Sequence, residues 1–336
     1  MSSSLDPNAA RRELSPCQAI AHSNIALAKY WGKRDVAQNL PDVPSLSLTL
    51  AGLSTTTRVA FDADLDADEL VLNGTPADAD RKRKVTALLD RVRRAGRVEM
   101  FARVESSNDF PTASGLASSA SGFAALALAS LGAAGLAWPA AAVSDLARRS
   151  SVSAARSVFG GFVALEAGAS QAEPLEVGTA ARQLRMVIAV TDAGPKQVGS
   201  TEGMLRTQGS SPYYASWREA APRVYRELRE ALLDGDFEKV GEAMEHSTML
   251  MHASMLSARP ALIYMNPATL SVIARVRELR RGGTFAYFTM DAGPHVKVLT
   301  QGSDTALLAR ELEILPAVSR VIVTGVGGDA RVVGGA

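Results

Sequence analysis

The segment 110–126, FPTASGLASSASGFAAL, constrains the fold more than any other part of the chain. It starts with Phe-Pro, continues as a run of Ser, Ala and Gly, and becomes an apolar stretch that we predict to be helical up to about Ala134. Small side chains leave backbone N–H groups accessible, and such groups at a helix start bind anions. The segment therefore either packs a helix closely or binds phosphate, and on composition alone close packing is the commoner case. No Gly-Lys-Ser/Thr follows, so this is not the lysine-bearing phosphate loop.

The rest of the chain alternates strand-like and helix-like segments without a strict strand–helix–strand rhythm. Apolar alternation and β-branched residues predict strands over 18–30, 45–61, 69–73, 98–106, 182–194 and 319–324. Helical periodicity is found over 80–95, 213–233, 237–257, 267–281 and 304–312. This order favours an α+β fold in two lobes over a doubly wound sheet. We expect a disordered polar tail over 1–14, an N-terminal domain over 15–184 and a C-terminal domain over 185–336.

Composition excludes several classes of protein. The formal net charge is +1 and aromatic residues make up 5% of the chain, which argues against binding to nucleic acid or to a charged membrane surface. The single cysteine, Cys17, excludes an internal disulfide and fits a reducing cytoplasm. No apolar run reaches the length of a membrane span, and the N-terminus lacks the apolar region of a secretory signal.

Six separated motifs resemble one known family. The small-residue loop resembles the ATP loop of the superfamily of galactokinase, homoserine kinase, mevalonate kinase and phosphomevalonate kinase (GHMP kinases), and within it the mevalonate diphosphate decarboxylase branch. NIALAKYWGKRD (24–35), SAARSVFGGFV (153–163), STEGM (200–204), MHASML (251–256) and DAGPH (291–295) are similar to that branch and follow in the same order. The resemblance spans roughly 21–328, nearly the whole chain.

The resemblance implies a fold and a nucleotide site. The fold would have an N-terminal mixed or antiparallel sheet with helices, like the second domain of ribosomal protein S5. A C-terminal ferredoxin-like α/β sandwich would follow, with a cleft between the two. The residues implied to bind ATP are Asn108, Pro111, Ser114, Gly115, Leu116, Ala117, Ser118, Ser119, Ser121 and Lys196.

Three residues are the candidates for catalysis. A carboxylate at the end of a strand, before a Gly-Pro turn, either caps its own turn or faces a cleft where it orients or deprotonates a hydroxyl, and the resemblance makes Asp291 the catalytic group. A guanidinium holds a carboxylate through two parallel hydrogen bonds, so Arg156 would grip the group that leaves as carbon dioxide, unless it merely forms a surface ion pair. The resemblance places Asn24 in hydrogen bonds near both.

Substrate binding involves a second set of residues. The resemblance assigns the diphosphate of the substrate to the Tyr30 hydroxyl and the Lys33 ammonium group, both suitable donors to phosphate oxygens. We expect Lys29 and Arg34 to lie at a solvated strand end, with snorkelling side chains. The residues implied to bind substrate are Tyr30, Lys33, Ser151, Ser153, Arg156 and Ser200.

The chain departs from the family pattern at a few positions. Ala155 replaces a cysteine that we expect to have a packing role, Gly199 replaces a serine donor, and Val43-Pro44 stand where Asn and Ser are common. The last difference bears on which phosphorylation state of mevalonate fits the site. Met249, Met251 and Met255 share one helix and are expected in the core.

The four histidines show no metal-ligand spacing, so we predict no zinc held by the protein, and a magnesium ion held by phosphates and water. The implied function is ATP-dependent decarboxylation of mevalonate 5-diphosphate in isoprenoid biosynthesis, by a cytoplasmic homodimer. A related enzyme acting on mevalonate or a monophosphate, and an inactive nucleotide-binding regulator, are the alternatives.

Overall fold

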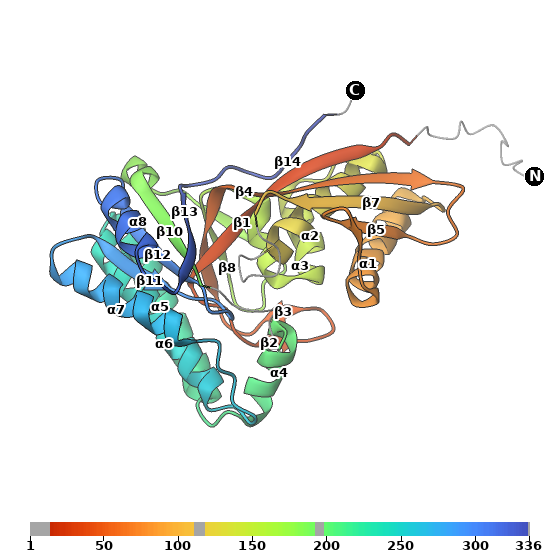
Figure 1. The fold of residues 1–336 in the computed structure, drawn as a ribbon. Coiled ribbons are helices and arrows are strands. Elements are labelled where there is room, and N and C mark those ends of the chain that lie inside the picture. Colours follow the sequence, from red (N-terminus) through yellow and green to blue (C-terminus); the bar gives the residue numbers. More distant parts are fainter. Residues whose placement is uncertain (1–13, 111–117, 192–197, 335–336) are drawn as a thin grey trace, which may run out of the picture.

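The computed structural model describes residues 14–110, 118–191 and 198–334, so the expected disordered tail lies outside it except for Leu14. Two sheets with their helices lie side by side in two lobes (Figure 1). The predicted α+β fold in two lobes is thereby confirmed. In the described ranges no helix combines the length and apolar character that crossing a membrane requires.

The N-terminal lobe is built on an eight-stranded sheet. Its strands follow the order β14-β1-β4-β7-β5-β6, with β8 pairing with β4 and β9. All pairs are antiparallel except the parallel pair of β5 and β7. The strands are β1 (Cys17–Ala28), β4 (Ser45–Asp62), β5 (Glu69–Leu72), β6 (Thr75–Pro76), β7 (Phe101–Asn108), β8 (Phe162–Leu165), β9 (Glu173–Leu175) and β14 (Arg331–Val332).

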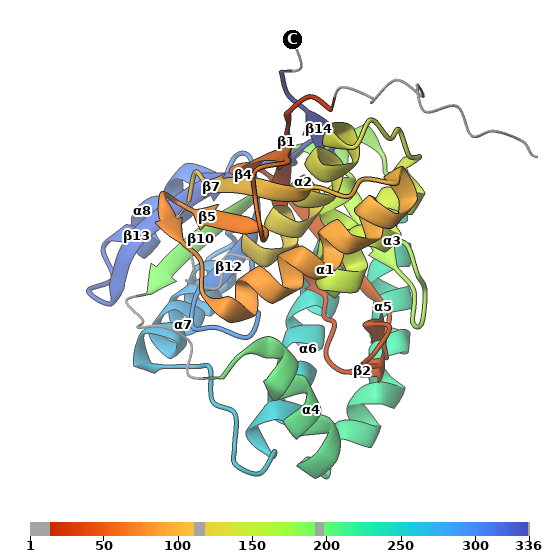
Figure 2. The same cartoon turned by 90° about the vertical axis from the view of Figure 1, so that its right-hand side faces the viewer.

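Helices cover one face of this sheet (Figure 2). They are α1 (Ala79–Gly96), α2 (Ser118–Ala133), α3 (Ala140–Ser150) and the 3-10 helix η1 (Val152–Val158). Helix α2 contacts β1, β4, α3 and η1, because its Ala, Ser and Gly side chains allow close approach on nearly every side. The small-residue segment thus packs a buried helix, and it also places the start of that helix at a pocket described below.

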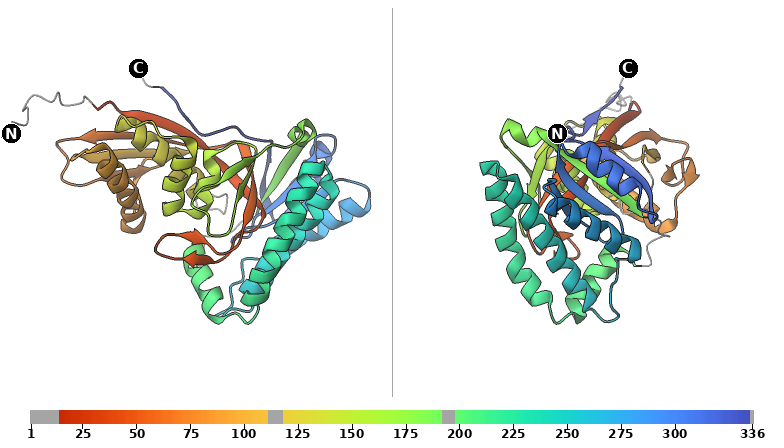
Figure 3. Two further views of the ribbon diagram at one scale, coloured as in Figure 1. Left: turned by 180° about the vertical axis from the view of Figure 1, so that it is seen from behind. Right: turned by 60° about the vertical axis from the view of Figure 1, so that its left-hand side comes forward.

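The C-terminal lobe contains a four-stranded antiparallel sheet in the order β11-β12-β10-β13. Its strands are β10 (Leu184–Thr191), β11 (Ala286–Thr289), β12 (Val296–Gln301) and β13 (Val318–Thr324). Its helices are α4 (Ser200–Ser210), α5 (Tyr214–Asp234), α6 (Phe237–Leu256), α7 (Pro267–Arg281) and α8 (Thr305–Glu313), preceded by the 3-10 helix η2 (Thr179–Gln183). Helices α5 and α6 run side by side along this sheet and extend beyond it toward α4 (Figure 3).

The two lobes share a hydrophobic core. Leu27 of β1 and Leu48 of β4 pack in one cluster with Met186 of β10 and Leu228 of α5. The chain also returns at its end, because β14 pairs with β1 in the N-terminal sheet. The lobes are therefore held together by buried apolar contact, which fixes the position of any site at their junction. The domain division at 184/185 remains a prediction.

The elements that were not predicted include a short hairpin and one helix. A short hairpin, β2 (Lys33–Asp35) and β3 (Leu40–Pro41), follows β1, and α4 follows β10. Helix α4 contains Gly203, Gly209 and several hydroxyl residues, which are weak helix formers, so its stability depends on packing against the rest of the lobe. Met204 supplies that packing in a cluster with Trp31 and Trp217.

Candidate active site

Asp291 lies two residues after the end of β11, in the segment that leads into β12. Its carboxylate forms two ion pairs: Oδ1 lies 2.7 Å from Nζ of Lys29, and Oδ2 lies 3.2 Å from Nζ of Lys297. The side chain of Asp291 is 27% exposed, whereas both lysines are buried. The carboxylate is therefore held in a fixed orientation by two cations, with Oδ2 buried and another part of the side chain open to solvent.

The expectation of a solvated Lys29 was wrong. The Lys29 side chain is 1% exposed, and the backbone N–H of Lys29 donates to Oγ of Ser247 in α6 at 2.9 Å. Lys29 follows the last residue of β1, where the chain enters the junction between the lobes, so the alternation of the strand no longer sets its direction. The ion pair with Asp291, 262 positions away, offsets part of the cost of burying its charge.

These surroundings lower the pKa values of both Lys29 and Asp291, by different causes. Burial lowers the pKa of Lys29 to about 8, although the Asp291 carboxylate works against that change, and Lys297 adds to it. Burial works to raise the pKa of Asp291, but Lys29 and Lys297 together hold it far below its usual range. At neutral pH, Asp291 is therefore a carboxylate and Lys29 is an ammonium ion.

Arg156 lies in η1 and is buried. Its Nε donates to Oγ of Ser47 at 3.1 Å and its Nη1 donates to Oγ of Ser45 at 2.7 Å. Among the described residues no carboxylate lies within ion-pair distance of Arg156. Burial lowers its pKa to about 10, and the charge of Asp291 opposes this shift, so Arg156 remains charged at neutral pH. A buried guanidinium held by neutral hydroxyl groups is suited to bind an anionic ligand.

Asn24 joins β1 to η1, beside an irregularity in the pairing of β1 with β4. Its Nδ2 donates to the carbonyl oxygen of Ser153 at 3.0 Å and to Oγ of Ser157 at 2.7 Å. Its Oδ1 is buried and has no hydrogen-bond partner in the described part of the chain. Asn24 therefore fixes the 3-10 helix that carries Arg156 and leaves one acceptor available. The hydroxyls of Ser151 and Ser153 lie 3.2 Å apart in the same segment.

Tyr30 presents a buried hydroxyl group for which the described residues provide no hydrogen-bond partner. Burial raises the pKa of Tyr30 far above its usual value, and the neighbouring charges of Arg156 and Asp42 act on it in opposite directions. The phenol is therefore neutral and can donate a hydrogen bond to an anion. Arg156 and Tyr30 are close enough to influence each other electrostatically, which supports their assignment to one site.

Lys33 lies in β2, and its Nζ is 3.5 Å from Oγ1 of Thr201 at the start of α4. Ser200, another predicted substrate residue, is the first residue of that helix. Burial and the nearby charge of Lys84 both lower the pKa of Lys33. Lys84 belongs to α1 and was not predicted, although the basic run RKRK in which it lies was visible in the sequence. Two neighbouring ammonium groups beside a helix N-terminus favour a polyphosphate ligand.

The backbone of Lys33 is clamped by Gln208 of α4. Lys33 N donates to Oε1 of Gln208 at 2.9 Å, and Nε2 of Gln208 donates to the carbonyl oxygen of Lys33 at 3.0 Å. Next to it, the indole N–H of Trp31 donates to Oγ1 of Thr207 at 3.0 Å, and that of Trp217 donates to the Trp31 carbonyl at 2.9 Å. The unpredicted helix α4 therefore positions the strand that carries Lys33.

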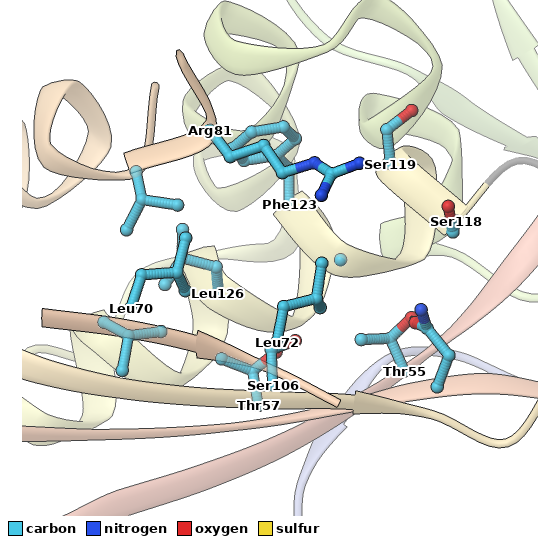
Figure 4. Close-up of a pocket in the computed structure, with 14 residues that line it drawn as sticks. Thr55, Thr57, Leu70, Leu72, Arg81, Ser106, Ser118, Ser119, Phe123 and Leu126 are labelled. Atoms are coloured by element: carbon cyan, nitrogen blue, oxygen red, sulfur yellow. The ribbon is translucent and has the colours of Figure 1, made fainter. Parts of the chain in front are cut away.

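A pocket of about 230 Å³ opens at the start of α2. Apolar side chains of β5, β7 and α2, including Leu70, Leu72 and Leu126, line one end, and the hydroxyls of Ser118 and Ser119 stand at the other (Figure 4). Arg81 reaches from α1 toward Ser119 (Figure 4). An apolar slot that leads to a helix N-terminus suits a purine base followed by phosphates.

The predicted nucleotide residues fall in three groups. Asn108, Ser118 and Ser119 line the pocket. Ser121 is fully buried, and its hydroxyl lies 2.7 Å from that of Thr55. Outside the described residues lie Pro111, Ser114, Gly115, Leu116, Ala117 and Lys196.

The comparisons with known proteins agree with this geometry. The profile of the diphosphomevalonate decarboxylase-like N-terminal domain matches residues 21–175, and that of the mevalonate 5-diphosphate decarboxylase C-terminal domain matches residues 186–327. The chain belongs to the diphosphomevalonate decarboxylase family. The resemblance found in the six motifs is confirmed across nearly their whole span.

Relatives from several organisms match over most of their length. Diphosphomevalonate decarboxylase of Schizosaccharomyces pombe is 33% identical, over 88% of this chain and 82% of the relative. Phosphomevalonate decarboxylase of Haloferax volcanii is 33% identical, over 94% of this chain and 96% of the relative. The mevalonate diphosphate decarboxylase structure from Staphylococcus aureus has a TM-score of 0.90 at 35% identity, over 95% and 98% of the two chains. A second structure, described as MDDEF in complex with MVAPP, AMPPCP and magnesium, has a TM-score of 0.90 at 39% identity over the same shares.

Proposed function

We propose that the chain catalyses the ATP-dependent decarboxylation of mevalonate 5-diphosphate to isopentenyl diphosphate. One observation carries the proposal: a carboxylate, Asp291, fixed by two buried lysines, acts electrostatically on a buried guanidinium, Arg156, that has hydroxyl partners. This is the arrangement that a hydroxy acid needs if its hydroxyl is to be oriented while its carboxylate is held. Relatives of the family are named for this reaction, and one related structure is described with MVAPP and AMPPCP.

The reaction would proceed in two stages. The 3-hydroxyl oxygen, oriented by Asp291, attacks the terminal phosphorus of ATP, ADP leaves, and the hydroxyl proton is released to a phosphate oxygen or to water. The bond between C3 and the new phosphate then breaks, and positive character develops at the tertiary carbon. The electrons of the C1–C2 bond form the C2–C3 double bond as carbon dioxide leaves. Each stage depends on positioning and on stabilisation of developing charge.

The residues divide between the two ends of the substrate. Arg156 would bind the carboxylate until it leaves, with Asn24 and Ser153 supporting the segment that carries it. Tyr30 and Lys33 would bind the diphosphate, and Ser151 and Ser200 would donate further hydrogen bonds. Lys29 keeps Asp291 ionised and oriented rather than touching the substrate through a solvated side chain.

The nucleotide would occupy the pocket at the start of α2. Its base would lie against Leu70, Leu72 and Leu126, with its phosphates directed to Ser118 and Ser119. The remaining ATP residues of the set, including Lys196 and the loop 111–117, are assigned by the resemblance.

Magnesium fits this donor set when it is bound through phosphate oxygens and water. Within the described ranges no three His, Cys, Asp or Glu side chains gather into a group that could hold a metal ion. The described donors at the pocket and around Lys33 are hydroxyl and cationic groups, which suit a metal–nucleotide complex rather than a bare ion. When bound, magnesium would neutralise phosphate charge during the transfer.

A panel of substrates tests the assignment. The enzyme is supplied with ATP and either mevalonate, its 5-phosphate, its 3-phosphate or its 5-diphosphate, and both ADP and carbon dioxide are measured. We expect stoichiometric ADP and carbon dioxide from the 5-diphosphate. Equal or faster turnover of the 5-phosphate would instead favour the activity named for the Haloferax relative. ADP without carbon dioxide would indicate a kinase, and ATP binding without turnover would indicate a regulator.

A cytoplasmic homodimer belongs to the same proposal. Its support is the resemblance to the family and the single buried Cys17, which fits a reducing compartment. Sedimentation equilibrium measures the assembly state directly, and a mass of about 35 kDa in solution would contradict the dimer.

A further inference from the structure

Lys297 is an unusual residue for its place in the fold. It lies in β12, a central strand of the C-terminal sheet, and its side chain is fully buried. Its strand neighbours Val296 and Val298 belong to the apolar core of that lobe. A buried ammonium group is costly and an apolar side chain is often neutral or stabilising at such a position, so the charge requires an explanation beyond stability.

The charge of Lys297 is directed at the catalytic carboxylate. Its Nζ lies 3.2 Å from Oδ2 of Asp291, while Nζ of Lys29 lies 2.7 Å from Oδ1. The two lysines come from different lobes, since Lys29 follows β1 and Lys297 belongs to β12. One cation per oxygen fixes the plane of the carboxylate, which a single partner would leave free to rotate about its bond to Cβ.

We propose that Lys297 is a positioning residue for the decarboxylation: it holds Oδ2 of Asp291 so that the ionised carboxylate presents a fixed acceptor to the substrate hydroxyl. The inference rests on the proposed role of Asp291, and Lys297 acts through that residue without touching the substrate. The step it supports is orientation of the hydroxyl before phosphoryl transfer. Misplacement of a reacting group by about 1 Å can slow a reaction roughly 100-fold.

The surroundings allow this role to be separated from a structural one. The charged and titratable groups that act on this cluster are Lys29 at the end of β1, Arg156 in η1, His252 in α6 and Lys297 in β12. Burial lowers the pKa of His252 to about 4, with further lowering by Lys29 and Lys297, so His252 is neutral at the pH of an assay. Removing Lys297 takes away a charge that lowers the pKa values of both Asp291 and Lys29. Both pKa values must therefore rise.

The test compares Lys297→Met and Lys297→Arg with Lys239→Met. Lys239 supplies a matched control because it forms an exposed ion pair with Asp236 at 2.7 Å, outside the site. Turnover is measured against pH with mevalonate 5-diphosphate and ATP, and folding is checked by thermal melting. We expect Lys297→Met to lower kcat about 10- to 100-fold with a small change in KM, and to move the basic limb of the kcat–pH profile, which Lys29 sets, upward. Lys297→Arg should restore the wild-type limb, and Lys239→Met should match the wild type.

A measurement without turnover separates this inference from the proposed function. The 15Nζ resonance of Lys29, identified by its loss in Lys29→Met, is titrated in the wild type and in both Lys297 variants, because Lys297 lowers the pKa of Lys29 across the shared carboxylate. An upward shift of the Lys29 titration in Lys297→Met, reversed in Lys297→Arg, supports the inference even if mevalonate 5-diphosphate proves not to be the substrate. An unchanged titration and an unchanged basic limb in a folded Lys297→Met protein would overturn it. If Lys297→Met does not fold, a Lys297→Arg protein whose Lys29 titration rises above that of the wild type would overturn it as well.

Discussion

Replacing Asp291 with asparagine should affect stability and catalysis by different routes. The substitution keeps the shape of the side chain but leaves Lys29 and Lys297 buried without a carboxylate between them. Removing one partner from a buried ion pair costs about 3–5 kcal/mol, and the partial exposure of Asp291 favours the lower end, about 3 kcal/mol. For a chain of 336 residues the unfolding entropy is about 0.7 kcal/mol/K, so the melting temperature should fall by about 4 °C.

The destabilisation should depend on pH in a specific direction. The pKa of Lys29 is about 8 with Asp291 present, and it must fall further when the carboxylate is lost. Between the lowered pKa of Lys29 and pH 8, the folded variant binds fewer protons than the unfolded variant, so the stability of the variant rises with pH. The stability of the wild type does not change with pH in that window, because its Lys29 stays protonated there. The difference in the free energy of unfolding should therefore shrink by about 1.4 kcal/mol for each pH unit across the window.

Urea unfolding at pH 6 and pH 8 measures this difference, and ADP release measures turnover in parallel. We expect turnover to fall by about 10²- to 10⁴-fold, while the nucleotide still binds. Asp66→Asn, on an exposed loop, is the matched control and should change neither quantity. An equal destabilisation at both pH values would show that Lys29 stays charged without its partner, and the argument from the buried ion pair would be refuted.

Other substitutions test separate parts of the site. Arg156→Gln removes the guanidinium proposed to hold the substrate carboxylate. The loss of about 2 kcal/mol or more of transition-state stabilisation should lower kcat/KM for carbon dioxide release roughly thirtyfold. A threefold loss or less would contradict the proposed role. Turnover of the wild type should decline above about pH 8, where Lys29 loses its proton. Lys29→Arg should move this basic limb of the pH–rate profile to higher pH, because arginine keeps its proton. A basic limb at the same pH in the variant would show that another group causes the decline. Gly32→Ala would place a Cβ 1.9 Å from Oη of Tyr214, at a backbone φ of +110°. The melting temperature of this variant should therefore drop by several degrees. Gly209→Ala is the control, because Gly209 has open space around it, and it should be neutral or stabilising.

The regular elements could be predicted because their apolar periodicity is strong. Strands β1 and β4 and helices α5, α6 and α7 begin and end within two residues of the predicted bounds. Periodicity also explains one partial error. Met251 and Met255 are four positions apart on the buried face of α6, as expected, but Met249 lies off that face and is 39% exposed.

The centre of the site was less accessible from sequence, because it forms where the lobes meet. The motifs predicted Asp291, Arg156 and Asn24 as site residues, but the distances between them depend on packing between distant segments. The burial of Lys29 could not be inferred from the strand pattern, which ends one residue before it. Lys297 did leave a signal that was overlooked: a lysine between two valines in a buried strand requires a nearby counter-charge.

The architecture explains why the carboxylate needs two cations. In the proposed reaction two polyphosphates and a carboxylate meet in one site, and Lys33, Lys84 and Arg156 would supply positive charge for them. An anionic Asp291 in the same place would repel these ligands unless its own charge were balanced, and Lys29 and Lys297 provide that balance. Because one lysine comes from each lobe, the carboxylate is neutralised and oriented only when the lobes pack together. The buried ion pairs therefore make the proposed acceptor for the substrate hydroxyl a product of the completed fold rather than of either lobe alone.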